Sequence, residues 1–148
     1  MKVFVALLFL FFVSFSCKTT KVLRKTDCSY PLEGLWIGTF KYAPGTGTIQ
    51  TPQYFSFIIK PDGSLIVESK DSGISYAATG YWKLAENILT CKYAYSSSVN
   101  NVALHQIATA SYHNSGELSG GEWHNTDSDW NPTTDPNQTG TFVMHRIN

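Results

Sequence analysis

The sequence lacks the signatures of the common catalytic and nucleotide-binding sites. No nucleophile motif, phosphate-binding loop or paired-carboxylate signature occurs in its 148 residues. No stretch shows a sustained helical period, and no repeat or low-complexity tract divides the chain. These absences argue against an enzyme, so we predict no catalytic residues and no cofactor.

Basic charge is scarce beyond the first 27 residues. Residues 28–148 contain six Lys and Arg against ten Asp and Glu, which gives this part a net charge of −4. Domains that bind nucleic acids instead carry a basic face or stripe. We therefore expect no nucleic-acid partner.

A long apolar run occurs only at the N-terminus. Residues 3–15 are almost all apolar and follow Lys2, but they fall short of the roughly 20 residues of a membrane-spanning helix. Ser14 and Ser16 place small side chains before Cys17, as signal-peptide cleavage requires. We expect residues 1–16 to be a signal peptide and the protein to be exported.

The Ser16–Cys17 junction resembles the lipobox of bacterial lipoproteins, in which the cysteine becomes the lipidated first residue. The resemblance implies lipidation of Cys17 and a membrane anchor in the cell envelope. Lys18 stands where an Asp would favour inner-membrane retention, so the outer membrane is the expected site, with soluble secretion as the alternative. Residues 17–28 then form a basic stem, which either lies against anionic head groups or only spaces the domain from its anchor.

Cysteine is rare, and its count is odd. Three cysteines in an exported protein leave one over if they pair. If Cys17 carries lipid, Cys28 and Cys91 form an even pair in an oxidising compartment. A Cys28–Cys91 disulfide is one hypothesis, and two unpaired thiols are the other. Neither cysteine has a second metal ligand at close spacing, so no metal site is expected there.

Short runs of β-branched and aromatic residues recur between turns from residue 29 to residue 148. Pro61–Asp62–Gly63 is the strongest hairpin signal among these turns. Eight sequential antiparallel strands leave unpaired edges unless the sheet closes, so we predict an all-β domain with an eight-stranded antiparallel up-and-down barrel. A β-sandwich is the alternative. The predicted strands are 34–42, 54–60, 64–69, 74–84, 88–95, 102–113, 117–125 and 139–147.

Gly34–Leu35–Trp36 opens the first predicted strand, and Arg146 lies near the end of the last. This pattern resembles the lipocalin and avidin-like (calycin) superfamily, in which a Gly-x-Trp tryptophan packs under a basic side chain from the chain's end. The resemblance implies structural roles for Gly34, Trp36 and Arg146, and a barrel that holds a small ligand. Biotin is not expected, because Gly38 stands where the avidin-like pattern has an asparagine.

Four aromatic side chains on predicted strands are the candidate ligand contacts. Strand alternation groups Trp36 with Tyr42, and Ser119 with Trp123. For residues 102–113, both sides mix small and polar residues, so the inward side stays open. We expect a small apolar or aromatic molecule to contact Trp36, Tyr42, Trp82 and Trp123. The alternative is a filled barrel without ligand that acts as an interaction or structural module of the envelope.

Two polar clusters resemble metal sites only in part. Asp127, Asp129 and Asn131 follow the opening of a calcium loop, but Pro132 stands where that loop needs glycine. A polar turn explains this segment better. Glu122, His124 and His113 fall on one predicted hairpin, where paired surface residues are the simpler explanation. We therefore expect no metal site.

Overall fold

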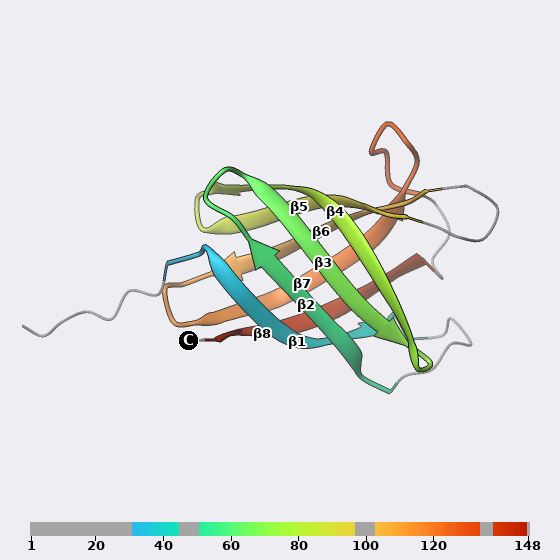
Figure 1. Cartoon of the computed structure of the whole chain (residues 1–148), viewed down its shortest axis with the longest axis horizontal. Helices are drawn as coiled ribbons and strands as arrows, with labels where there is room; N and C mark the ends of the chain where they lie inside the picture. Colours follow the sequence, from blue (N-terminus) through green and yellow to red (C-terminus); the bar gives the residue numbers. More distant parts are fainter. Residues whose placement is uncertain (1–30, 45–50, 97–102, 134–137, 148) are drawn as a thin grey trace, which may run out of the picture.

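Eight antiparallel strands form a closed barrel in which each strand pairs with its sequence neighbours and β8 pairs with β1 (Figure 1). The computed structural model describes residues 31–44, 51–96, 103–133 and 138–147. The predicted up-and-down barrel is confirmed, and the β-sandwich alternative is wrong. The strands are β1 (Gly34–Tyr42), β2 (Gln53–Ile59), β3 (Ser64–Asp71), β4 (Ile74–Ala85), β5 (Ile88–Tyr95), β6 (Leu104–Tyr112), β7 (Glu117–Thr126) and β8 (Thr139–Ile147).

The strand bounds follow the turn residues closely. Each predicted strand end lies within two residues of the observed one, since Gly, Asn, Asp and Pro interrupt the β-forming runs. Within the described ranges, no helix is long and apolar enough to cross a membrane. The predicted signal peptide, Cys17, the basic stem and Cys28 all lie outside the described residues.

The tight turns use residues that tolerate positive φ. Gly63 has φ +85° in the β2–β3 turn, where Asp62 Oδ1 accepts hydrogen bonds from the Ser64 backbone N–H and Oγ at 2.9 and 2.6 Å. These bonds lower the pKa of Asp62. Glu86 and Asn87 both have positive φ in the β4–β5 turn, as the two-residue hairpin turns that match strand twist require. Such turns fix the register of the hairpins.

Alternate side chains of each strand point into the barrel, with one exception in β7. Leu118 and Trp123 are both buried although they lie five positions apart, which in a regular strand would place them on opposite faces. A bulge shifts the register between Leu118 and Gly121 and brings them to the same face. Ser119 instead pairs with the outward-facing Ser111 of β6. The predicted grouping of Ser119 with Trp123 is therefore wrong, since an extra residue in a strand reverses alternation beyond it.

One end of the barrel is filled by side chains. Trp36 is fully buried there, and its Nε1 donates to the Leu32 carbonyl at 2.7 Å. Its direct partner across β1 and β8 is Arg146, whose Nη2 and Nε donate to the Glu33 carbonyl at 3.0 and 3.3 Å. Gly34 has φ +136°, and a Cβ there would lie 2.9 Å from Arg146 Nη2. The structure thus brings Gly34, Trp36 and Arg146 together as the closure of this end, which we call the filled end.

Candidate functional site

The barrel interior is hollow at the end opposite Trp36, which we call the open end. A cavity of about 590 Å³ lies there. Its walls come from the final residues of β1, β3, β5 and β7 and the first residues of β2, β4 and β6. Because successive strands are antiparallel, these strand ends all lie at the same end of the barrel. Residues that are far apart in the sequence therefore line one cavity.

Aromatic rings dominate the cavity wall. Trp123 packs edge to face against Tyr42 and Phe40, with ring centroids 5.4 and 6.0 Å apart. Tyr76 and Tyr95 form a second edge-to-face pair with centroids 6.5 Å apart. Such pairs hold rings in fixed orientations and present flat apolar surfaces to a bound molecule. The cavity therefore suits a molecule with an apolar or aromatic body.

A carboxylate and two amides add polar groups to this aromatic wall. Tyr42 Oη donates to Asp71 Oδ2 at 2.7 Å, and Ser72 Oγ donates to Asp71 Oδ1 at 3.0 Å. On the other side, Gln106 Nε2 donates to Asn125 Oδ1 at 2.8 Å. A few fixed polar groups in an apolar cavity orient a ligand and discriminate between ligands.

Two phenols of the cavity, those of Tyr42 and Tyr95, stay protonated at neutral pH. Burial raises the pKa of Tyr42, and its hydrogen bond to the Asp71 carboxylate raises it further. Burial raises the pKa of Tyr95 to about 12, although a hydrogen bond with Ser69 opposes the shift. Both phenols are therefore neutral groups in the cavity.

Two of the four predicted ligand contacts line this cavity, and two lie elsewhere. Tyr42 and Trp123 are part of its wall. Trp36 is buried in the filled end. Trp82 is also near that end, where its Nε1 donates to the Lys60 carbonyl in the β2–β3 turn at 2.9 Å. The structure thus brings Tyr42 and Trp123 together and separates them from Trp36 and Trp82.

Sequence reasoning missed Asp71, Tyr76 and Tyr95 as cavity residues. A usable signal was present in β3, where the apolar residues Leu65 and Val67 lie two positions apart and are both buried, whereas Ile66 and Glu68 are less buried. The same alternation continues to Ser69 and Asp71. It would have marked Asp71 as a carboxylate on the inner side of its strand.

The Trp123 indole N–H is a further polar group at this wall. Trp123 is buried, and its Nε1 has no hydrogen-bond partner among the described residues. The indole lies against Gly140, where an added Cβ would meet Nε1 at 2.6 Å. Gly140 therefore makes room for the ring that Tyr42 and Phe40 contact.

The predicted disulfide and the cysteine chemistry depend on a residue that is not described. Cys91 is fully buried and has no disulfide partner among the described residues, and burial raises the pKa of its thiol. Cys28 lies outside the described residues, so its pairing with Cys91 stays a prediction. A buried thiol with a raised pKa is a poor nucleophile.

The Asp-rich loop after β7 is a hydrogen-bonded turn. Asp127 Oδ1 accepts from the Asp129 and Asn131 backbone N–H groups at 2.9 and 2.8 Å. The hydrogen bond from the Asn131 side chain, and then these backbone bonds, lower the pKa of Asp127. Trp130 packs on the outside of the barrel, with Lys92 Nζ 5.6 Å from its ring centroid. No group of three His, Cys, Asp or Glu among the described residues is arranged to hold a metal ion.

Comparison with known proteins adds no family to these observations. No protein-family model matches the chain, and no curated protein matches it either. The closed eight-stranded antiparallel barrel fits a lipocalin-like fold.

Proposed function

We propose that this protein is an exported, lipid-anchored member of the lipocalin and avidin-like superfamily that binds a small apolar or aromatic molecule in the open end of its barrel. The cavity of about 590 Å³ carries the proposal. Ligand sites in proteins commonly measure roughly 300–1,000 Å³. A barrel filled along its whole length would have favoured the alternative, a structural module without ligand.

The cavity wall supports an apolar or aromatic ligand. Tyr42, Trp123 and Phe40 form one contact group, and Tyr76 and Tyr95 form another. Burial of apolar ligand surface against such rings is favourable by about 25 cal/mol per Å². We assign Tyr42 and Trp123 to ligand binding, and we assign Gly34, Trp36 and Arg146 to closure of the filled end.

The proposed location depends on the N-terminal sequence alone. Residues 1–16 act as the signal peptide, Cys17 carries the lipid, and residues 17–28 form the stem that holds the domain near the outer membrane. Metabolic labelling with a radioactive fatty acid tests this anchor. Label should enter the wild-type protein and be absent from Cys17→Ala, and equal labelling of both would refute lipidation at Cys17.

Ligand binding is tested first by native mass spectrometry of the purified protein, in which a retained ligand appears as added mass. Binding of a neutral probe, 2-naphthalenemethanol, is then measured by isothermal titration calorimetry. Ala78 is buried and lines the cavity, so Ala78→Phe should weaken probe binding by about tenfold or more, because the added ring occupies ligand space.

Ala94→Phe is the matched control. Ala94 lies on the neighbouring strand β5 opposite Thr79, and it alternates with the buried Tyr93 and Tyr95. The same ring is therefore added to the outer surface, and probe affinity should stay within about twofold. A folded Ala78→Phe variant that binds the probe as tightly as Ala94→Phe would refute the cavity as the binding site.

A further inference from the structure

Among the described residues, the cavity has one formal charge, and it is negative. Among the described lining residues, Asp71 is the only Asp or Glu, and none is Lys, Arg or His. The three internal segments outside the described ranges, 45–50, 97–102 and 134–137, contain no Lys, Arg or His in their sequence. No basic side chain from these parts of the chain neutralises the carboxylate in the cavity.

In the part of the chain that the structure describes, only neutral donors hold Asp71 in place. Its two carboxylate oxygens accept hydrogen bonds from Tyr42 Oη and Ser72 Oγ. Its neighbour Lys70 is exposed and points to the outer side of β3, as strand alternation requires. A carboxylate that is positioned by neutral donors and lacks a cationic partner retains its attraction for a cation.

Aromatic rings line the same cavity as Asp71. Tyr42 bonds directly to Asp71, and Tyr76 and Tyr95 form an edge-to-face pair in the wall of the same cavity. Trp123 packs against Tyr42. The faces of tyrosine and tryptophan rings attract cations, and clusters of such rings recognise organic ammonium groups in many binding sites.

We propose that the cavity selects an organic monocation, a molecule with an apolar or aromatic body and one protonated amine, whose ammonium group binds Asp71 and whose body packs between Tyr42, Tyr95 and Trp123. This inference rests on the proposed ligand-binding function and narrows its ligand class. An anionic ligand such as a fatty acid would place a second negative charge near Asp71 without a basic partner, which is unfavourable.

Three probes that share one ring system test the charge preference. These are 2-naphthalenemethylamine, 2-naphthalenemethanol and 2-naphthoate, each titrated into the protein at pH 7 and low salt by calorimetry. The amine should bind about tenfold more tightly than the alcohol, which is the combined effect of an ion pair with the partly buried Asp71 and a cation–π contact. The carboxylate should bind more weakly than the alcohol.

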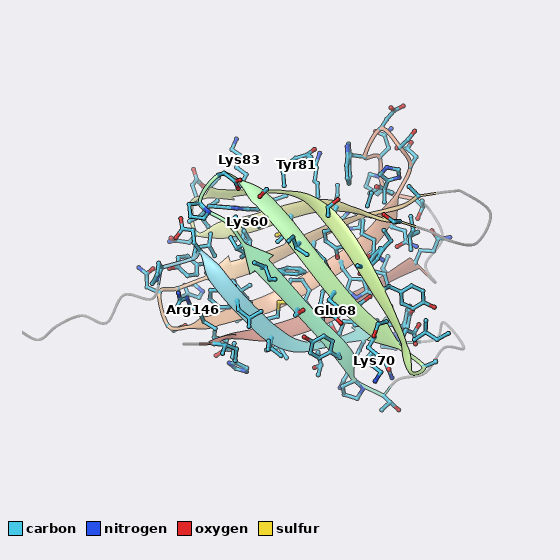
Figure 2. All side chains as sticks on the ribbon, viewed as in Figure 1. Lys60, Glu68, Lys70, Tyr81, Lys83 and Arg146 are labelled. Carbon is cyan, nitrogen blue, oxygen red and sulfur yellow. The ribbon has the colours of Figure 1, made fainter. Side chains whose placement is uncertain are left out.

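Asp71→Asn should abolish the advantage of the amine over the alcohol and leave the affinity for the alcohol within about twofold. Glu68→Gln is the matched control. This substitution removes the same charge from the same strand. The Glu68 side chain, however, is exposed on the outer surface (Figure 2). This variant should keep the preference for the amine.

The outcomes separate the two proposals. If none of the three probes binds, both proposals are refuted. If the alcohol binds and the amine binds no better, ligand binding stands and the cation preference is refuted. Should Asp71→Asn fail to fold, salt titration of the wild type decides, because an ion pair is screened by salt. The amine-to-alcohol affinity ratio should then fall between 0.05 and 0.5 M NaCl (roughly a threefold change in Debye length), and a constant ratio would refute the proposal.

Discussion

The two ends of this barrel use aromatic residues in different ways. At the filled end, Trp36 is fully buried and its indole N–H is bonded to the Leu32 carbonyl. At the open end, Trp123 is also buried, but its indole N–H has no partner among the described residues and its ring borders the cavity. The same residue type therefore closes the barrel at one end and forms the wall of a candidate site at the other.

The polar groups follow the same division. Arg146 at the filled end donates to a backbone carbonyl and covers Gly34, whereas Asp71 at the open end lines a hollow. A barrel of eight strands has an interior just wide enough for side chains to fill it or to leave space for one small ligand. Filling one end stabilises the closed sheet, so the other end can stay open.

The largest expected effect is on stability, from Trp36→Ala. Removal of a fully buried tryptophan and its hydrogen bond should lower the free energy of unfolding by about 3–5 kcal/mol. Trp123→Ala should cost less, about 2–3 kcal/mol, because part of the lost packing borders a cavity that already exists. Urea unfolding followed by circular dichroism measures both values.

The same two variants should affect ligand affinity in the opposite order: the one that costs less stability should weaken ligand binding more. Trp123→Ala should weaken binding of 2-naphthalenemethanol, whereas any folded Trp36→Ala protein should bind it as the wild type does. Equal losses of affinity in the two variants would contradict the division between a filled and an open end.

The strand pattern of the sequence predicted nearly all of the fold. Turn residues such as Pro61–Asp62–Gly63 separate runs whose ends match the observed strands. With Trp36 facing inward, strand alternation then predicted which side chains of β1 face the interior. It failed in β7, because Ser119 and Gly120 lie in a bulge and Gly120 has φ +59°. No composition rule placed that extra residue.

The candidate site was harder to predict than the fold. Alternation shows whether a side chain points inward, but it does not show at which end the interior is filled. Trp36 and Trp82 were therefore grouped with Tyr42 and Trp123 although they lie near the opposite end. In β6 both faces mix small and polar residues, and only the closed structure shows that Gln106 and Tyr112 face inward.

The next largest expected effect on stability is a fall in the free energy of unfolding at alkaline pH. Burial raises the pKa of Tyr93 above 10 and that of Tyr95 to about 12. A phenol with a raised pKa in the folded state contributes its full stability below pH 10, and this contribution is lost as the pH rises through the folded-state pKa. The free energy of unfolding should therefore fall above pH 10, by roughly 1.4 kcal/mol per pH unit for each such phenol.

Phenylalanine variants compare the two environments at high pH. Tyr93→Phe and Tyr95→Phe should each flatten the decline between pH 10 and pH 11.5, with pH 7 as the reference for each variant. Because the pKa of Tyr95 is raised to about 12 and burial also raises that of Tyr93 well above 10, the two variants should flatten the decline by nearly the same amount up to pH 11.5. A clearly larger effect of Tyr95→Phe would mean that the pKa of Tyr93 is raised less than that of Tyr95. Water would then reach Tyr93 more readily than it reaches Tyr95 at the cavity wall.

The smallest effect, at pH 7, should differ in sign between two tyrosines. Tyr42 Oη is bonded to Asp71 at 2.7 Å, so Tyr42→Phe should lower the free energy of unfolding by about 0.5–1.5 kcal/mol. Tyr93 is fully buried, and its hydroxyl has no partner among the described residues. Because an unsatisfied buried hydroxyl is unfavourable, Tyr93→Phe should raise the free energy of unfolding by about 1 kcal/mol. Urea unfolding of both variants measures this difference, and a destabilised Tyr93→Phe would mean that the Tyr93 hydroxyl bonds a buried water, so that the hollow of the open end extends toward the middle of the barrel.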